Sequence, residues 1–393
     1  GALICCVLLG IISTSVHATR AVWIWDKDRY VNTILKSSSE QDKLFKFTAN
    51  PHNTRAKIDT FYLEAYRYFA KDAARLAAFI GKANSKGIKV YFLDGDPSWA
   101  VAYQEEALAR VSTALNFNRV YRDSAFSGVV FDIEPYLLVS ADLSASGNDI
   151  PLEPYLLPQW KTKRAEVEKK YLELLARIKA LMGQSDFGVA VPVLFSESGR
   201  GGQPSLAERI LDIVDFVVVM DYRDVALRVI RDGMPFVEAA GKRGKRALIG
   251  VETIDLSSIG EGNNASSFAE EGVRVMDGEL VKIQRVLGSK KGYGGIAIHY
   301  YNSYRGLQMN DRNRPLANVP QLTAMKIEPF KIDGDPAKWD SVRFYSVNKK
   351  ENVIYQAERL WGGEKDISGA FAFAWAPGKI YLGLKVKDNV LVV

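Results

Sequence analysis

The sequence predicts a (β/α)8 TIM barrel, a closed ring of eight parallel strands surrounded by helices, followed by a partial all-β sandwich domain. Segments typical of strands and helices alternate eight times over roughly 300 residues, which is the size of such a barrel. The strand-like segments are continuous runs of β-branched and aromatic residues, as expected for parallel strands buried on both faces. A doubly wound open sheet is the competing fold. It would carry a phosphate-binding glycine loop after its first strand, and no such loop occurs here.

The eight predicted strands are, in chain order, residues 21–25, 58–64, 89–94, 128–134, 187–194, 216–222, 247–253 and 295–301. Apolar residues at helical spacing predict helices over residues 72–85 and 160–182, and a long helix ending near Leu287. The alanine-rich stretch after Ser98 predicts another helix. The predicted barrel domain spans residues 19–320.

The first 18 residues have the pattern of a secretory signal peptide. Residues 2–12 form an uninterrupted apolar run that is too short to cross a bilayer as a helix, and Val16-His17-Ala18 has a small-x-small cleavage pattern. We therefore expect a secreted, periplasmic or cell-surface protein, with a membrane anchor as the alternative. Both cysteines, Cys5 and Cys6, lie in this run, so the mature protein would have no disulfide.

Composition argues against several other functions. The net charge of +6 is modest for 393 residues, and the basic residues are scattered rather than clustered, so we expect no nucleic-acid partner. No P-loop, dinucleotide fingerprint or metal-ligand spacing occurs, so we expect no cofactor and no metal. No later apolar stretch is long enough to cross a membrane.

Polar and aromatic residues gather where the predicted strands end. Active sites of (β/α)8 barrels form at the carboxyl ends of the strands, so these residues are the candidate substrate-contacting groups. They are Trp25 on the first strand, Tyr62 and Glu64 on the second, Asp94 and the nearby Trp99 on the third, Asp132, Glu134 and Tyr136 on the fourth, Met220, Asp221 and Tyr222 on the sixth, Glu252 on the seventh, and His299 and Tyr301 on the eighth.

Asp132 and Glu134 are the main catalytic candidates. Side chains two residues apart on a strand share a face, so both carboxyl groups should point toward the barrel axis above Val130. Two carboxylates this close cannot both ionise freely, and one should keep its proton near neutral pH. Such a group can protonate a glycosidic oxygen. The same alternation places His299 and Tyr301 on one face of the last strand, above smaller residues that would leave space for a substrate.

Residues 127–136 (SGVVFDIEPY) resemble the fourth-strand signature D-G-x-D-x-D-x-E of family 18 glycoside hydrolases, the chitinases and related N-acetylglucosaminidases. Ser127 and Val130 stand in place of the first two aspartates. Residues 219–222 (VMDY) resemble the family's sixth-strand M-x-Y motif, and residues 295–301 lie where the last strand of the family usually carries a tryptophan.

The resemblance implies that Glu134 is the general acid and that Asp132 orients and stabilises the acetamido group of the substrate. The carbonyl of that group would be the nucleophile, with Tyr222 hydrogen-bonding it. We therefore expect a secreted glycoside hydrolase that cleaves a polysaccharide or other glycan, with N-acetylhexosamine as the implied sugar.

Three alternatives remain open at this point. Many retaining glycosidases with this barrel use glutamates at the ends of strands four and seven, which would make Glu134 the acid/base and Glu252 the nucleophile. A barrel that has lost activity could bind a glycan without cleaving it. A barrel enzyme acting on another small molecule is the third alternative.

The tail predicts a second, all-β domain over residues 325–393. Residues 331–339 (KIDGDPAKW), 369–375 (GAFAFAW) and 379–388 (KIYLGLKVKD) are short alternating strands with turns. They resemble the start of family 9 carbohydrate-binding modules, in which I-D-G-x-x-x-x-W opens the domain. The resemblance implies that the chain holds the N-terminal part of such a module, with the ligand residues expected beyond Val393.

Overall fold

A computed structural model describes residues 18–54, 56–138, 160–197, 203–256, 264–309, 324–333, 335–348, 363 and 367–388. The chain divides into two compact units, Gly1–Asn313 and Arg314–Val393. The predicted signal peptide lies outside the described residues, apart from Ala18. No helix within the described ranges is long and apolar enough to cross a membrane.

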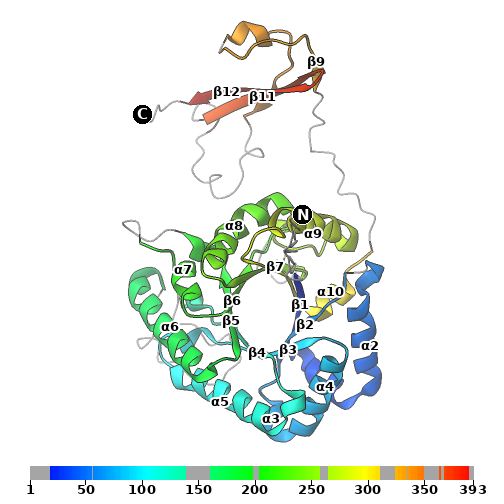
Figure 1. Ribbon diagram of the computed structural model, residues 1–393, viewed down its shortest axis with the longest axis vertical. Coiled ribbons are helices and arrows are strands. Elements are labelled where there is room, and N and C mark those ends of the chain that lie inside the picture. The colour runs from blue at the N-terminus through cyan, green and yellow to red at the C-terminus, as the bar shows by residue number, and fades with distance from the viewer. Residues whose placement is uncertain are drawn as a thin grey trace, which may run out of the picture. The chain divides into compact units, whose positions relative to one another are not determined.

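The first unit is a closed barrel of eight parallel strands, which confirms the predicted fold class (Figure 1). Each strand pairs with its neighbours in the sequence, and β1 closes the ring against β8. The strands are β1 (Thr19–Ile24), β2 (Thr60–Glu64), β3 (Lys89–Asp94), β4 (Gly128–Phe131), β5 (Asp186–Pro192), β6 (Phe216–Met220), β7 (Arg246–Glu252) and β8 (Tyr293–His299).

Helices form the outer layer of the barrel, as Figure 1 shows in the view along its axis. They are α1 (Tyr30–Lys36), α2 (Ser38–Ala49), α3 (Tyr68–Lys71), α4 (Ala73–Ser85), α5 (Gln104–Val120), α6 (Trp160–Met182), α7 (Leu206–Leu211), α8 (Ala226–Lys242), α9 (Gly272–Leu287) and α10 (Tyr301–Gly306). The helices predicted over residues 72–85 and 160–182 and the helix ending near Leu287 are confirmed.

The alternation of side chains along the strands produces two separate cores. On β4, Val130 belongs to the cluster inside the barrel, whereas Val129 and Phe131 pack in the larger cluster between strands and helices. Trp23 of β1 and Tyr62 of β2 fill the barrel interior, with ring centroids 5.3 Å apart. The floor beneath the barrel mouth is therefore packed with side chains.

Four strands end two or three residues earlier than predicted. β4 ends at Phe131, β5 at Pro192, β6 at Met220 and β8 at His299. After β4 the chain still follows β3 for one residue, because the Asp132 amide donates to the Asp94 carbonyl at 2.9 Å. Pro135, which has no amide hydrogen, then begins the short 3-10 helix Pro135–Leu137. The main catalytic candidates therefore lie just beyond the last strand residue.

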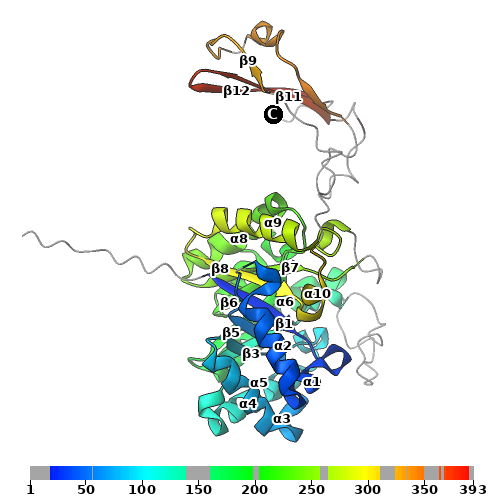
Figure 2. The same ribbon diagram turned by 90° about the vertical axis from the view of Figure 1, so that its right-hand side faces the viewer.

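The second unit contains a four-stranded sheet (Figure 2). β11 (Ile367–Ala376) and β12 (Lys379–Asp388) form a long antiparallel hairpin, β10 (Tyr345–Val347) pairs antiparallel with β11, and β9 (Met325–Lys326) pairs parallel with it. One face of the hairpin is buried at Ala372, Ala374 and Tyr381. The sheet confirms a separate all-β unit, but within the described residues of this unit it has a single layer.

Candidate active site

Asp132 lies just beyond β4, and its carboxyl group is set deeply into the barrel mouth. Its Oδ1 is inaccessible to solvent and has no hydrogen-bond partner among the described residues. Burial, and then the negative charge of Glu134, raise the pKa of Asp132 well above its ordinary value. The approach of β3 at this point requires glycine, because a Cβ at Gly95 would lie 2.1 Å from the Asp132 carbonyl oxygen. The pair predicted to share a proton is thus electrostatically coupled.

Glu134 accepts a hydrogen bond on Oε1 from the hydroxyl of Tyr136. Burial and the charge of Glu134 raise the pKa of Tyr136, so this hydroxyl stays protonated as a donor. Tyr171 of α6, a fully buried residue, contributes a second phenol near the pair. Its pKa is raised by burial and then by the charges of Asp132 and Glu134. The sequence analysis did not select Tyr171, because its position in α6 is that of an ordinary apolar-face residue.

Tyr222 lies beyond β6 and faces the same acidic groups. Burial raises its pKa, and the charges of Glu252, Asp132 and Glu134 raise it further, in that order. The residue is half-buried and keeps its proton throughout the neutral range. The charges of Asp132 and Glu134 therefore both act on the Tyr222 hydroxyl.

Glu252 and His299 form a bonded pair at the ends of β7 and β8. Oε1 of Glu252 accepts the amide hydrogens of Thr253 and Ile254, each at 2.7 Å, and Oε2 lies 2.7 Å from His299 Nδ1. His299 Nε2 in turn lies 2.9 Å from the indole nitrogen of Trp25. Glu252 is only 1% exposed. Both of its oxygens therefore already have hydrogen-bond partners.

Several of the predicted substrate-contacting residues are buried in the packed core. Tyr62 is 1% exposed inside the barrel, and Trp99, 2% exposed, packs against Phe131 in the outer core. Tyr301 is fully buried against Tyr30, because β8 ends at His299 and the alternation does not continue into α10. The burial of these three aromatic rings does not favour the predicted contact with a sugar.

Two aspartates from the same set also point to the helix layer. Asp94 forms an ion pair with Arg110 of α5 at 3.6 Å, and burial raises its pKa to about 6 despite that cation. Asp221 is fully buried, with one carboxyl oxygen close to Gly233 of α8. Neither aspartate shares the inward parity of Asp132.

The remaining candidates lie nearer the mouth. Glu64 is half-buried and accepts the Asp26 amide hydrogen at 2.6 Å, and burial raises its pKa. Met220, 8% exposed, lies beside Gly250 of β7. The space expected beneath the polar residues is filled, since a Cβ at Gly250 would lie 3.5 Å from the ring of Trp23.

The described residues contain no group of three or more His, Cys, Asp or Glu side chains that could hold a metal ion. At the barrel mouth, carboxyl groups lie beside the phenol groups of Tyr136 and Tyr222. The arrangement defines a class of protein: a (β/α)8 barrel with a coupled carboxyl pair just beyond its fourth strand.

No protein-family model matches the chain, and no curated protein matches it. Among solved structures it is similar to a chitinase from Chromobacterium violaceum, at 11% identity and a TM-score of 0.41, over 74% of this chain and 97% of that one. It is also similar to a class V chitinase from Pseudomonas fluorescens, at 11% identity and a TM-score of 0.41, over 74% and 98%. A third is the spore cortex-lytic enzyme SleL from Bacillus megaterium, at 12% identity and a TM-score of 0.39, over 72% and 70%.

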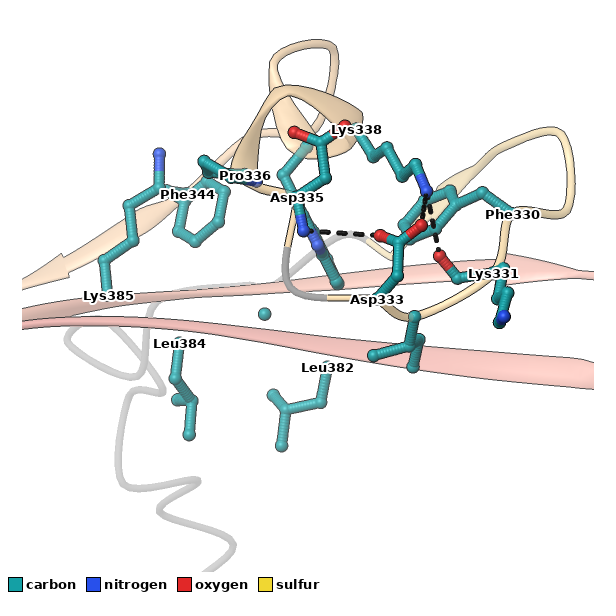
Figure 3. A pocket seen from close by; sticks show the side chains of 13 residues that line it. Phe330, Lys331, Asp333, Asp335, Pro336, Lys338, Phe344, Leu382, Leu384 and Lys385 are labelled. Atoms are coloured by element: carbon teal, nitrogen blue, oxygen red, sulfur yellow. Dashed lines mark hydrogen bonds and ion pairs between the residues drawn. The ribbon is translucent and has the colours of Figure 1, made fainter.

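The C-terminal unit has a hollow of about 250 Å³ between residues 330–344 and β12 (Figure 3). Three aromatic rings line it, those of Phe330, Trp339 and Phe344. Lys338 donates to the carboxylate of Asp333, and the ammonium group of Lys385 lies 4.0 Å from the centre of the Phe344 ring. That the ligand residues of this unit lie beyond Val393 stays a prediction.

Proposed function

We propose that this protein is a glycoside hydrolase in which Glu134 is the general acid and Asp132 is its partner. The observation that carries the proposal is the pair of half-buried carboxyl groups just beyond β4, in which the charge of Glu134 acts on Asp132. Burial, and then the charge of Glu134, raise the pKa of Asp132 well above its ordinary value, and we propose that the two carboxyl groups share one proton. A carboxylic acid that keeps its proton at neutral pH is what protonation of a glycosidic oxygen requires.

In the proposed reaction, Glu134 gives its proton to the glycosidic oxygen as the bond from that oxygen to C1 breaks. The acetamido carbonyl oxygen of the same sugar attacks C1, and Asp132 stabilises the positive charge that develops on the acetamido group. Tyr222 donates a hydrogen bond to this group. Water then attacks C1, the bond between C1 and the acetamido oxygen breaks, and the proton of the water passes to Glu134 and restores the acid. The proposed substrate is a polysaccharide or oligosaccharide containing N-acetylhexosamine.

The bonding of Glu252 favours this mechanism over a covalent one. A nucleophilic carboxylate needs an oxygen that can reach C1 of the sugar. Glu252 is 1% exposed, and its two oxygens accept from two backbone amides and face His299. We therefore propose a positioning role for Glu252 rather than the role of nucleophile.

A panel of substrates tests the proposal. The full chain would be incubated with colloidal chitin, cellulose, xylan and the p-nitrophenyl glycosides of N-acetylglucosamine, N,N′-diacetylchitobiose and glucose. We expect release of product from the N-acetylated substrates, and a loss of about 10²-fold or more in Glu134→Gln. Glu105→Gln is the matched control, because Glu105 is exposed on α5 and forms an ion pair with Arg177 of α6 in the helix layer.

Product release that survives in Glu134→Gln would refute the assignment of the acid. Binding of a polysaccharide without cleavage, equal in wild type and Glu134→Gln, would indicate the non-catalytic glycan-binding barrel instead.

We also propose that the C-terminal unit holds the enzyme on its polymeric substrate. Aromatic faces beside carboxylate and ammonium groups suit the apolar faces and hydroxyl groups of a sugar, and the hollow beside β12 offers both. Attachment of a second binding unit raises the effective concentration of the polymer near the barrel.

A further inference from the structure

Of the four tryptophans in the first unit, all of them described, three are buried. Trp23 is 0% exposed, Trp99 2% and Trp160 8%. Trp25 is half-buried and directly follows β1 at the barrel mouth. The flat, apolar face of an indole ring is well suited to pack against the apolar face of a pyranose ring. Trp25 is therefore the tryptophan of the first unit that has exposed surface at the strand ends.

Resting on the proposed function, we propose that Trp25 is the surface on which a sugar ring stacks, and that His299 positions its indole ring. β1 and β8 are neighbours in the barrel, and the last registered pair, Val22 with Ile298, places His299 beside the residues leading to Trp25. The proposal assigns the stacking role to the first strand, although the family resemblance located a tryptophan on the last.

The hydrogen bonds fix the protonation of His299. The indole nitrogen of Trp25 can only donate, so Nε2 of His299 at 2.9 Å must be the acceptor. The proton of the imidazole is then on Nδ1, which donates to Glu252 Oε2 at 2.7 Å. Each ring nitrogen already has a hydrogen-bond partner, so His299 acts as a positioning residue and is neither a base nor a metal ligand.

Glu252 anchors this arrangement to the backbone. The amide hydrogens of Thr253 and Ile254 both donate to its Oε1 at 2.7 Å. Backbone, carboxylate, imidazole and indole thus form one chain of hydrogen bonds across three neighbouring strands, β7, β8 and β1. Glu252, held by the backbone, orients the His299 ring, and the His299 ring in turn orients the indole ring of Trp25.

His299 also contacts the proposed catalytic machinery. Its ring lies nearly parallel to that of Tyr222, with centroids 5.9 Å apart and planes at 28°. The Trp23 ring also packs against His299 in an edge-to-face arrangement, with ring centroids 5.6 Å apart and planes at 78°. The His299 imidazole therefore contacts both Trp25, the proposed stacking surface, and Tyr222, the phenol that we propose to hydrogen-bond the acetamido group. Removing it should weaken substrate binding more than it slows the chemical step.

The test uses the full chain labelled with ¹⁵N-tryptophan. The indole N–H resonance of Trp25 is assigned from its loss in Trp25→Phe. We expect His299→Ala to shift this resonance, because the acceptor is gone. His299→Gln should largely preserve it, since the amide oxygen can accept from Trp25 while the amide nitrogen donates to Glu252. The Trp99 resonance is the internal control, because its indole nitrogen faces Glu106 at 3.4 Å and not His299.

Sugar binding is then tested with tri-N-acetylchitotriose in the Glu134→Gln background. We expect the sugar to shift the Trp25 resonance, and its Kd to rise about tenfold in Trp25→Ala and in His299→Ala, with rescue in His299→Gln. With p-nitrophenyl N,N′-diacetylchitobioside, the same two alanine variants should raise KM about tenfold and change kcat less.

An unshifted Trp25 resonance in His299→Ala would overturn the positioning role. A Trp25 resonance that does not respond to the sugar, or an unchanged Kd in Trp25→Ala, would overturn the stacking role. These readouts do not depend on turnover, so they are distinct from failure of the proposed hydrolysis, which would appear as absence of product with wild type.

Discussion

Replacing Asp221 with asparagine should stabilise the barrel, and the gain should grow as the pH rises. The Asp221 side chain is fully buried against α8, and neither carboxyl oxygen has a hydrogen-bond partner among the described residues. Burial raises its pKa well above the ordinary value of 3.8, and the nearby charge of Asp232 raises it further. Arg223 and Arg231 oppose the shift without cancelling it.

The sign of the effect follows from proton binding. Between pH 3.8 and the raised pKa, the folded protein holds a proton on Asp221 that the unfolded chain has lost. Rising pH therefore favours the unfolded chain, and Asp221 lowers the free energy of unfolding by about 1.4 kcal/mol per pH unit across that window. An asparagine side chain cannot ionise, so Asp221→Asn removes this slope. From pH 5 to pH 7 the advantage of the variant should grow by up to about 2.7 kcal/mol.

Urea unfolding of the full chain, followed by tryptophan fluorescence at pH 5, 6 and 7, measures this difference. Asp215→Asn is the matched control at the other end of β6. Burial alone would raise the pKa of Asp215, but hydrogen bonds from Lys179 and the Phe187 amide outweigh it, and the pKa is lowered. Asp215→Asn should therefore destabilise the fold. If the Asp221→Asn advantage were the same at all three pH values, the assignment of a buried, proton-holding carboxyl would be wrong.

The remaining predictions concern the site and the tail. Asp132→Asn should lower kcat by about 10²-fold. The same variant should raise the free energy of unfolding, and increasingly so between pH 5 and 7. The reason is that the pKa of Asp132 is raised like that of Asp221, so its ionisation also destabilises the folded protein. Loss of both activity and stability in this variant would contradict the idea that Asp132 serves catalysis at a cost in stability. In the tail, Phe344→Ala should weaken co-sedimentation of Glu134→Gln with the insoluble polymer about tenfold, whereas Lys379→Ala, at the start of β12 and outside the hollow, should not. Equal loss in both tail variants would refute the hollow as a binding site.

The position of the acid pair at the end of β4 could be predicted because it needs only local information. Strand alternation places Val130 inside the barrel, and the same alternation carries Asp132 to the mouth one step later. The rule failed where the strands ended earlier than their apolar runs suggested. Tyr301 continues the pattern of β8 in the sequence, but it is the first residue of α10 and is fully buried.

The sequence also could not separate catalytic from structural carboxyl groups. Glu252, Asp94 and Glu134 all follow strand-like runs, yet their partners come from other elements. The Arg110 partner of Asp94 is on α5, and the His299 partner of Glu252 is 47 positions along the chain. Whether a carboxylate is free to meet a substrate depends on contacts between such distant positions, which local patterns do not encode.

The sequence by itself therefore determined the barrel, the all-β tail and the strand end at which an acidic pair would lie. These follow from hydrophobic periodicity and from the rule that barrel sites form at the carboxyl ends of strands. Only the tertiary structure decided that Asp132 is buried beside Glu134, that Asp221 faces a helix, and that Trp25, His299 and Glu252 form one hydrogen-bonded chain. Burial and hydrogen bonding depend on which residues meet when the barrel closes. Closure pairs β1 with β8, which lie at opposite ends of the domain in the sequence.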